Sequence, residues 1–279
     1  MKRLNIGGSR YYQDKDGKLS LSVTEFISKI HPTSPSLISY FKNHPDPEGW
    51  AAERRAKGTA MAIILDSLSK GESVATDAIK KILLEANAEE GVRLSPATFA
   101  QYIEDLYKHG LSWVAFMKEK DGKTLMSEEF VSHPSGLLAG TVDWFGEFNF
   151  NKKRIIAILD WKIGNIYDTH ALQLEIYKEA IKSLPQFKNL DIMVFNWSPK
   201  DFSLKPKKTG FTEATYTPLK NQTGSKYAGN VGSAIEWGKT LGLFDFPTES
   251  LRLDMNAPVS PEKNVITTQN IITGEYSPF

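Results

Sequence analysis

The chain has 279 residues, of which 34 are Lys or Arg and 33 are Asp or Glu, and 41% are hydrophobic. This length and hydrophobic content suffice for an ordinary core, and we favour one domain over two small ones. The net charge of +1 excludes a globally basic surface, so any contact with nucleic acid must be local. Cysteine is absent, which excludes a disulfide framework, a thiol nucleophile and a cysteine-based zinc site.

The sequence shows no pattern typical of a signal peptide or of a membrane-spanning helix. Met1 to Arg3 are followed by polar residues rather than by the apolar segment of a signal peptide. No apolar run approaches the length of about 18 residues that indicates a membrane-spanning helix. We therefore expect a soluble, cytoplasmic protein with no membrane partner. The sequence leaves its oligomeric state open.

The first 120 residues predict a mainly helical part of the domain. Residues 11–21 alternate around an Asp-Gly pair and indicate a small hairpin, after which Ser22 is placed as the N-cap of a helix over 23–30. Further helices are expected over residues 36–43, 48–70 and 75–86. Another opens at Ser95-Pro96 and is expected to end at Gly110.

Residues 121–200 predict the sheet at the centre of the domain. Two hydrophobic runs, 137–148 and 154–163, are joined by the polar residues 149–152, a connection of hairpin length. Their pairing would bring Asp143 across from Asp160. A divalent cation between them most simply reconciles two carboxylates in an apolar sheet, and oxygen ligands favour Mg²⁺ or Mn²⁺ over zinc.

Asp160 and Lys162 end the second of these runs and alternate with Trp161. Because side chains on a strand alternate between faces, the acid and the lysine project to one side and the tryptophan to the other. By itself such a pair is more often a surface ion pair. The apolar run 155–159 before it, however, predicts a strand covered on both faces, with its charges at the sheet rim. We therefore interpret the pair as part of a catalytic site.

A helix follows the sheet residues, capped by Asp168 or Thr169. It carries Gln173 and Tyr177 one turn apart, beside an apolar stripe. An ordinary helix surface is the alternative interpretation of this pair. A buried strand over 190–197 comes after the helix, the crossover expected for a parallel neighbour. These elements predict an α/β fold with an N-terminal helical cover.

The order of these parts resembles the PD-(D/E)XK nuclease superfamily. Its motif consists of an acid on one strand, Gly-Thr-Val-Asp at 140–143, Asp-Trp-Lys at 160–162, and a helix with Gln-x-x-x-Tyr at 173–177. Segments 21–25 and 57–61 are similar to parts of the RecB-like branch, which holds phage exonucleases and mitochondrial genome maintenance exonucleases. The 57–61 segment is similar to the Gly-Thr start of a helix in that branch.

This resemblance implies a restriction-endonuclease-like fold, a mixed central sheet flanked by helices. We accordingly treat residues 1–279 as a single nuclease domain, with a catalytic sheet core at 121–200 and a C-terminal extension at 201–279. The activity implied is Mg²⁺- or Mn²⁺-dependent hydrolysis of DNA, most simply by an exonuclease acting on ends, with single strands preferred, in replication, repair or recombination. A structure-specific endonuclease of the same fold is one alternative. A nuclease fold with a weakened metal site, serving as a DNA-binding module, is another.

The resemblance also implies the site residues, which are acids, a lysine and a polar pair on a helix. The implied catalytic residues are Asp143, Asp160, Lys162, Glu128, Gln173 and Tyr177, with Asp143, Asp160, the Trp161 backbone carbonyl and Glu128 holding one or two ions. The resemblance favours Glu128 over Glu129, and strand alternation allows only one of them to face the metal. Lys162 would orient the attacking water, and the helix pair would hydrogen-bond the site or the DNA backbone.

Two positions depart from the family pattern. Val142 replaces the usual proline before the first acid, which affects backbone rather than a ligand. Ala62 lies where the branch commonly carries a metal-binding histidine, four residues after the Gly of the Gly-Thr segment. Asp66, one helical turn beyond Ala62, is the candidate replacement ligand.

A lysine-rich segment provides the candidate for local DNA binding. Between Pro199 and Lys226, six lysines face two acidic residues, with Tyr216 and Tyr227 interleaved, as in a groove that tracks phosphates and stacks bases. The nucleic-acid-binding candidates are Lys200, Lys205, Lys207 and Lys208. A solvated loop explains the same composition. Beyond it, the sequence predicts a weak helix over 228–243 and a short strand over 265–272.

Overall fold

The computed structural model describes residues 1–31, 38–39, 42–163, 167, 169–199 and 216–246. The chain divides into two compact units, Met1–Phe244 and Asp245–Phe279, and the fold below is that of the first. Several predicted features lie outside the described residues. They are Asp168, half of the helix over 36–43, the strand over 265–272, and the lysines Lys200, Lys205, Lys207 and Lys208.

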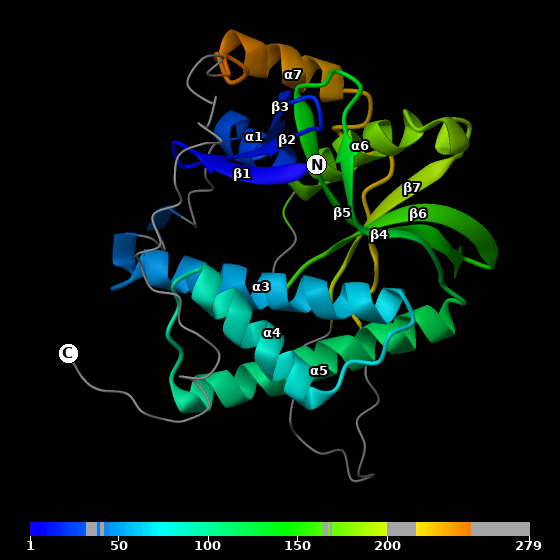
Figure 1. Cartoon of the computed structure of the whole chain (residues 1–279). Helices are drawn as coiled ribbons and strands as arrows, with labels where there is room; N and C mark the ends of the chain where they lie inside the picture. The colour runs from blue at the N-terminus through cyan, green and yellow to red at the C-terminus, as the bar shows by residue number, and fades with distance from the viewer. Residues whose placement is uncertain (32–37, 40–41, 164–166, 168, 200–215, 247–279) are drawn as a thin grey trace. The chain divides into compact units, whose positions relative to one another are not determined.

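A mixed sheet of eight strands forms the centre of the first unit (Figure 1). The strands are β1 (Lys2–Ile6), β2 (Ser9–Gln13), β3 (Leu19–Ser22), β4 (Lys123–Ser132), β5 (Leu138–Phe150), β6 (Lys153–Trp161), β7 (Ile192–Trp197) and β8 (Lys220–Asn221). Their order is β1-β2-β3-β5-β6-β7-β8, and β4 pairs with β5 off this path. The pairs β3–β5 and β6–β7 are parallel, and the others are antiparallel.

Six described helices flank the sheet. They are α1 (Val23–Ile30), α3 (Pro47–Ser69), α4 (Thr76–Glu89), α5 (Pro96–Glu119), α6 (Thr169–Lys182) and α7 (Val231–Thr240). The predicted α/β class is therefore confirmed, as are the N-terminal hairpin and the crossover through α6 to a parallel strand. No helix among the described residues has the length and apolar character needed to cross a bilayer.

The β5–β6 hairpin determines which residues meet at the sheet rim. Asn151 and Lys152 have φ angles of 49° and 63°, as a two-residue hairpin turn requires. The connection is thus shorter than the four residues predicted, because both strands extend further into it. In the resulting register Trp144 pairs with Leu159, so that Asp143 comes next to Asp160.

Helices α3, α4 and α5 form the predicted helical cover (Figure 1). Trp113 of α5 joins this cover to the sheet, since its ring lies edge-on to Trp144, Trp161 and Trp197 at centroid distances of 5.8, 5.2 and 5.2 Å. All four indoles are buried. Edge-to-face packing of this kind stabilises aromatic clusters beyond the area that they bury. Trp144 and Trp161 are therefore core residues.

One prediction about a helix boundary is wrong. Gly110 does not end a helix but lies within α5, where an added Cβ would approach Leu68 Cδ1 to 3.2 Å and Ile64 Cγ2 to 3.6 Å. The glycine therefore allows α5 to pass close to α3. The Gly58-Thr59 pair lies in the middle of α3, within the helix predicted over 48–70, and Asp46 caps that helix by accepting a hydrogen bond from Gly49 N–H.

Candidate active site

Asp143, Asp160 and Lys162 meet where β6 ends beside the middle of β5, and we call this place the rim of the sheet. Lys162 Nζ lies 2.6 Å from Asp160 Oδ1, and the Trp161 backbone N–H donates to Asp143 Oδ2 at 2.7 Å. Asp160 is only 2% exposed. The predicted alternation along β6 is therefore present, with the acid and the lysine together and the Trp161 indole in the core.

Glu128 comes to this cluster from β4. Its strand neighbours Ser127 and Glu129 pair with Trp144 and Val142, which places Glu128 opposite Asp143. Glu129 is exposed, whereas Glu128 is half-buried. The φ angle of Glu128 is 49°, a left-handed conformation that non-glycine residues rarely adopt and that concentrates at functional sites. The structure brings Glu128, rather than Glu129, to the acids.

The acids at the rim do not ionise independently. Burial, followed by the charges of Asp143 and Asp66, raises the pKa of Glu128 to about 8, against the opposing effect of Lys70. Burial and the Asp160 carboxylate raise the pKa of Asp143 to about 7, although the Lys162 ammonium and the Trp161 N–H act in the opposite direction. A pair of this kind titrates jointly, and a nearby cation favours its fully ionised form.

Lys162 remains charged in this environment. Burial disfavours the ammonium form, but the charges of Asp160 and Asp143 outweigh burial, so the pKa of Lys162 is raised. The site thus holds a fixed positive charge beside its carboxylates at neutral pH.

The raised pKa of Asp143 predicts that the fold loses stability as the pH rises. The ordinary pKa of this group is 3.8 and its pKa in the fold is about 7, so the folded state binds more protons between these values. The stabilisation is complete below pH 3.8 and is lost as the pH rises through about 7. In thermal unfolding without divalent cations, wild type should lose Tm between pH 5 and pH 8 more steeply than Asp143→Asn. Parallel Tm curves for the two proteins would contradict this assignment.

Helix α3 approaches the acid cluster with the face that carries Ala62, Asp66 and Lys70. Lys70 Nζ pairs with Asp66 Oδ2 at 2.7 Å, and the Asp66 charge contributes to the raised pKa of Glu128. Asp66 Oδ1 is buried and accepts no hydrogen bond from any described residue. Ala62 packs against the hydrophobic core one turn earlier. The structure therefore brings Asp66 to the acids, and its metal-binding role stays a prediction.

Gln173 and Tyr177 are buried on α6, so their interpretation as an ordinary helix surface is wrong. They are 7% and 4% exposed. An added Cβ at Gly140 would lie 2.6 Å from the Tyr177 hydroxyl oxygen, so glycine is required for the phenol to reach β5. Burial, and then the Asp143 charge, raise the pKa of Tyr177 well above its usual range, while a hydrogen bond with Gln173 opposes the shift. The pair therefore lies within the electrostatic range of the acids.

Three polar residues at the site escaped the sequence analysis. Asn196 Nδ2 donates to Asp160 Oδ2 at 2.7 Å, and Gln222 Nε2 donates to Asn196 Oδ1 at 2.8 Å. His170, in the first turn of α6, accepts a hydrogen bond at Nδ1 from Tyr167 N–H at 3.3 Å. Burial and the charge of Lys162 lower the pKa of His170 to about 4, so its imidazole is neutral. The sequence contained one signal for these residues, since Asn196 is a polar residue inside a strand predicted to be buried.

The donor set fits a divalent cation only if other ligands complete the site. Among the described residues, no three His, Asp or Glu side chains are grouped to hold a metal ion. Asp160 already accepts hydrogen bonds at both of its oxygens. Glu128 and Asp143, however, are paired carboxylates with raised pKa values. Mg²⁺ is usually held by one or two carboxylates together with water and substrate phosphates, so two acids suffice.

The two tyrosines of the lysine-rich segment have partners in the fold. Tyr216 lies edge-on to Phe116 of α5, with ring centroids 5.0 Å apart. Tyr227 lies 5.6 Å from the His31 ring, and Lys226 Nζ lies 5.2 Å from the Tyr227 ring centroid. Tyr216 is thus a packing residue in this structure. Base stacking by Tyr227 stays a prediction.

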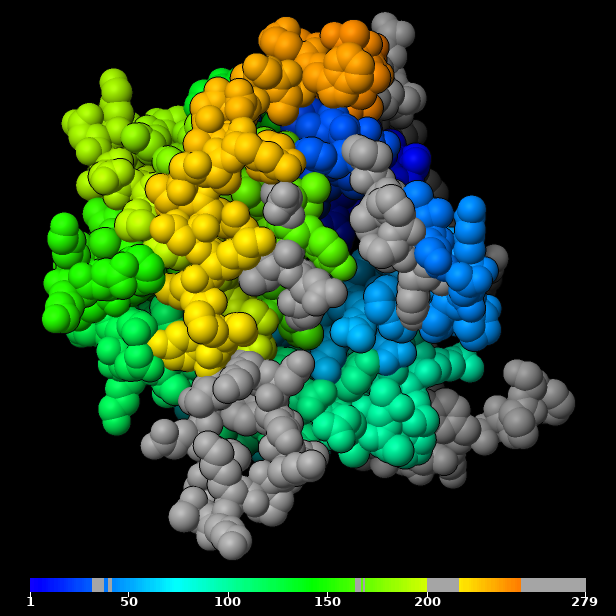
Figure 2. Space-filling view, turned by 180° about the vertical axis from the view of Figure 1, so that it is seen from behind, coloured from blue at the N-terminus to red at the C-terminus, as the bar shows by residue number. Residues whose placement is uncertain are grey.

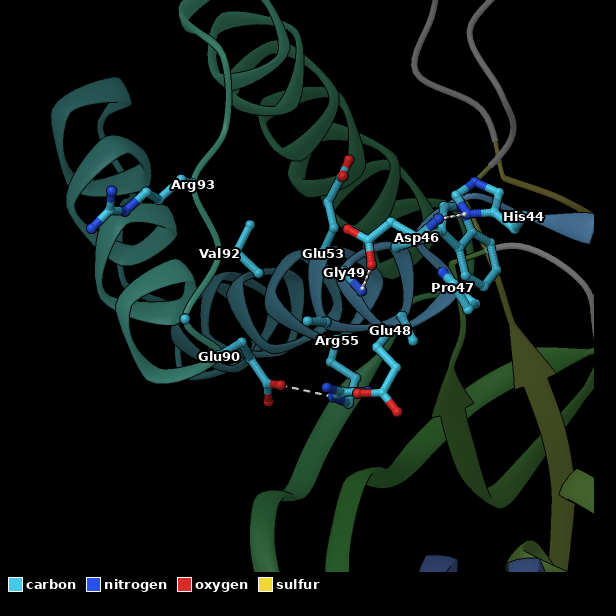
Figure 3. Close-up of a pocket in the computed structure, with 14 residues that line it drawn as sticks. His44, Asp46, Pro47, Glu48, Gly49, Glu53, Arg55, Glu90, Val92 and Arg93 are labelled. Atoms are coloured by element: carbon cyan, nitrogen blue, oxygen red, sulfur yellow. Dashed lines mark hydrogen bonds and ion pairs between the residues drawn. The ribbon is translucent and has the colours of Figure 1, made fainter. Parts of the chain in front are cut away.

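A separate hollow of about 1190 Å³ lies at the start of α3, beside the end of α4 (Figure 3). None of the rim acids lines it. Arg55 and Glu90 form an ion pair at 2.7 Å within it, and Asp46 caps α3 there. These charged groups satisfy one another, and we place the chemistry at the sheet rim instead.

Comparison with models of known protein families finds no match, and no curated protein sequence matches the chain.

Proposed function

We propose that this chain is a metal-dependent nuclease that hydrolyses phosphodiester bonds in DNA, and that its sheet is restriction-endonuclease-like. The observation that carries the proposal is the meeting of Asp143, Asp160 and Lys162 at one rim, with Glu128 opposite. These groups come from three strands, and one of them occupies a left-handed backbone conformation. A surface ion pair would require neither this convergence nor this burial.

The order of the core strands supports the fold assignment. β4, β5 and β6 are antiparallel neighbours, and α6 leads from β6 to the parallel strand β7. The acids come from β4, β5 and β6, and the polar pair comes from α6. This is the arrangement that the resemblance implies.

The chemistry assigns each rim residue a role. Glu128 and Asp143 would hold the cation, with Asp160 and the Trp161 carbonyl as further ligands. Bound Mg²⁺ or Mn²⁺ would lower the pKa of water and neutralise phosphate oxygens. Lys162, held charged by Asp160, would orient the attacking water and stabilise negative charge as it develops. Gln173 and Tyr177 would fix the site from α6.

Cleavage of DNA ends is the mode we propose, because the sequence resembles exonucleases. With Mg²⁺ or Mn²⁺, the protein should release nucleotides from linear single-stranded DNA and leave covalently closed circles intact. The measurement compares linear and circular substrates, each single- and double-stranded, over time on denaturing gels. Nicking of closed circles at the same rate as linear cleavage would replace the exonuclease with an endonuclease of the same fold.

A DNA-binding module with a weakened site is a second candidate. Two observations favour it: Ala62 offers no metal ligand, and Asp160 is hydrogen-bonded at both oxygens. This candidate predicts that DNA binding, measured by fluorescence anisotropy, is retained while no metal stimulates cleavage.

A further inference from the structure

We infer that Asn196 and Gln222 are positioning residues, which hold the Asp160 carboxylate in a fixed orientation for metal binding. The inference rests on the proposed function, because it concerns the same site. Asp160 Oδ2 accepts from Asn196 Nδ2 at 2.7 Å, and Asn196 Oδ1 accepts from Gln222 Nε2 at 2.8 Å. We refer to Asp160, Asn196 and Gln222 as the amide relay.

The surrounding strands define the orientation of each amide in the relay. Asn196 lies beside Asp160 in the parallel β6–β7 register, and the Gln222 backbone N–H donates to Val194 O at 2.9 Å. Asp160, Asn196 and Gln222 are 2%, 1% and 6% exposed. Because a carboxylate only accepts, Asn196 must turn its NH₂ toward Asp160 and its oxygen toward Gln222. The Gln222 NH₂ donates to the Asn196 oxygen and so supports this orientation of the Asn196 amide.

The relay gives the two oxygens of Asp160 different tasks. Oδ1 pairs with Lys162, a lysine whose proposed role is to act on water and phosphate, whereas Oδ2 is held by the relay. If Lys162 left Asp160 for the substrate, Oδ1 would become available as a ligand for a cation, while Oδ2 would stay held by Asn196. Groups that orient metal ligands in this way typically affect metal affinity or activity by about 10- to 100-fold.

Gln222 also connects the site to the surface. It directly follows β8 and lies within the lysine-rich segment. Its backbone oxygen accepts from Ser225 N–H at 3.0 Å, in the turn before Lys226. Figure 2 shows the segment around β8, in yellow, on the face of the molecule that continues into α7, in orange. The relay thus begins at an outer strand and ends at a catalytic carboxylate.

Two variants of Gln222 test the inference, with Mn²⁺ alone as the probe. Gln222→Met keeps the length of the side chain but removes the donor. Gln222→Glu keeps the shape but, when ionised, only accepts, so that it would compete with Asp160 for the Asn196 NH₂. Asn221→Ala, on the exposed neighbour in β8, is the matched control. Mn²⁺ affinity is measured by calorimetry without DNA, and kcat and KM are measured with linear DNA.

Both Gln222 variants should bind Mn²⁺ about 10-fold more weakly and lose kcat by a similar factor, with KM for DNA within about twofold of wild type. Gln222→Glu should bind Mn²⁺ more weakly than Gln222→Met. If Gln222 served only for packing, the isosteric Gln222→Glu would instead be the less affected of the two variants. Thermal unfolding identifies any variant that does not fold. The Gln222 variant that does fold is then used for the test. If both Gln222 variants bind Mn²⁺ as tightly as Asn221→Ala does, the role of the relay is refuted but the proposed function is not. Wild type that neither binds Mn²⁺ nor cleaves DNA would refute the proposed function itself.

Discussion

Lys162→Ala is expected to reduce the rate of DNA cleavage by about 10²- to 10³-fold, the loss seen when one fixed group that stabilises a charged transition state is removed. In the folded protein Lys162 lies 2.6 Å from Asp160, and its charge is maintained by two carboxylates. Its removal should leave DNA affinity nearly unchanged, because an interaction made mainly in the transition state contributes to kcat. Single-turnover cleavage of labelled DNA measures this effect.

The matched control for this variant is Lys153→Ala, at the exposed start of β6, the strand that Lys162 directly follows. It removes an equal charge from β6 without touching the rim, and should cleave like wild type. Asp160→Asn should behave like Lys162→Ala, since it removes both the proposed ligand and the charge that holds the lysine. Wild-type rates in Lys162→Ala and Asp160→Asn, with unchanged melting temperatures, would show that the chemistry lies elsewhere.

Trp113→Ala is expected to lower the free energy of unfolding by about 3–5 kcal/mol, the usual cost of truncating a buried aromatic residue. Trp113 is fully buried, lies edge-on to three tryptophans of the sheet, and donates from Nε1 to Ser69 Oγ at 3.0 Å. Its loss would leave a cavity between the helical cover and the sheet and remove the hydrogen bond to Ser69, whose hydroxyl still donates to Leu65 O at 2.7 Å. Urea denaturation followed by circular dichroism measures the change.

Trp237→Ala is the matched control, because Trp237 is 53% exposed on α7. Its free energy of unfolding should stay within about 0.5 kcal/mol of wild type, as for most surface substitutions. Equal losses in the two variants would mean that Trp113 does not join the helices to the sheet.

The parts of the site that were predictable are those encoded by short, regular patterns. Strand alternation put Asp160 and Lys162 on one face because the period of a strand is two residues and tolerates no slip. The hairpin brought Asp143 next to Asp160 even though its turn is two residues long. Register depended on the hydrophobic pattern of the strands, and the exact turn length did not alter it.

The unpredicted features depend on tertiary contacts. Gly110 reads locally as a helix end, but close packing against Leu68 and Ile64 places it inside α5. Asn196 and Gln222 are 26 residues apart, and no short pattern links them. The left-handed φ of Glu128 has no sequence signal either, since glutamate is not a residue that favours it. Such features follow from the assembled sheet.

The most direct test of the central claim compares wild type and Asp160→Asn on end-labelled linear single-stranded DNA, with Mg²⁺ and with a chelator. We predict that wild type with Mg²⁺ releases labelled nucleotides, that chelation stops the release, and that Asp160→Asn releases none while it still binds the DNA. Release that continues in the chelator, or at equal rates in both proteins, would contradict a metal-dependent site at the rim of β5 and β6.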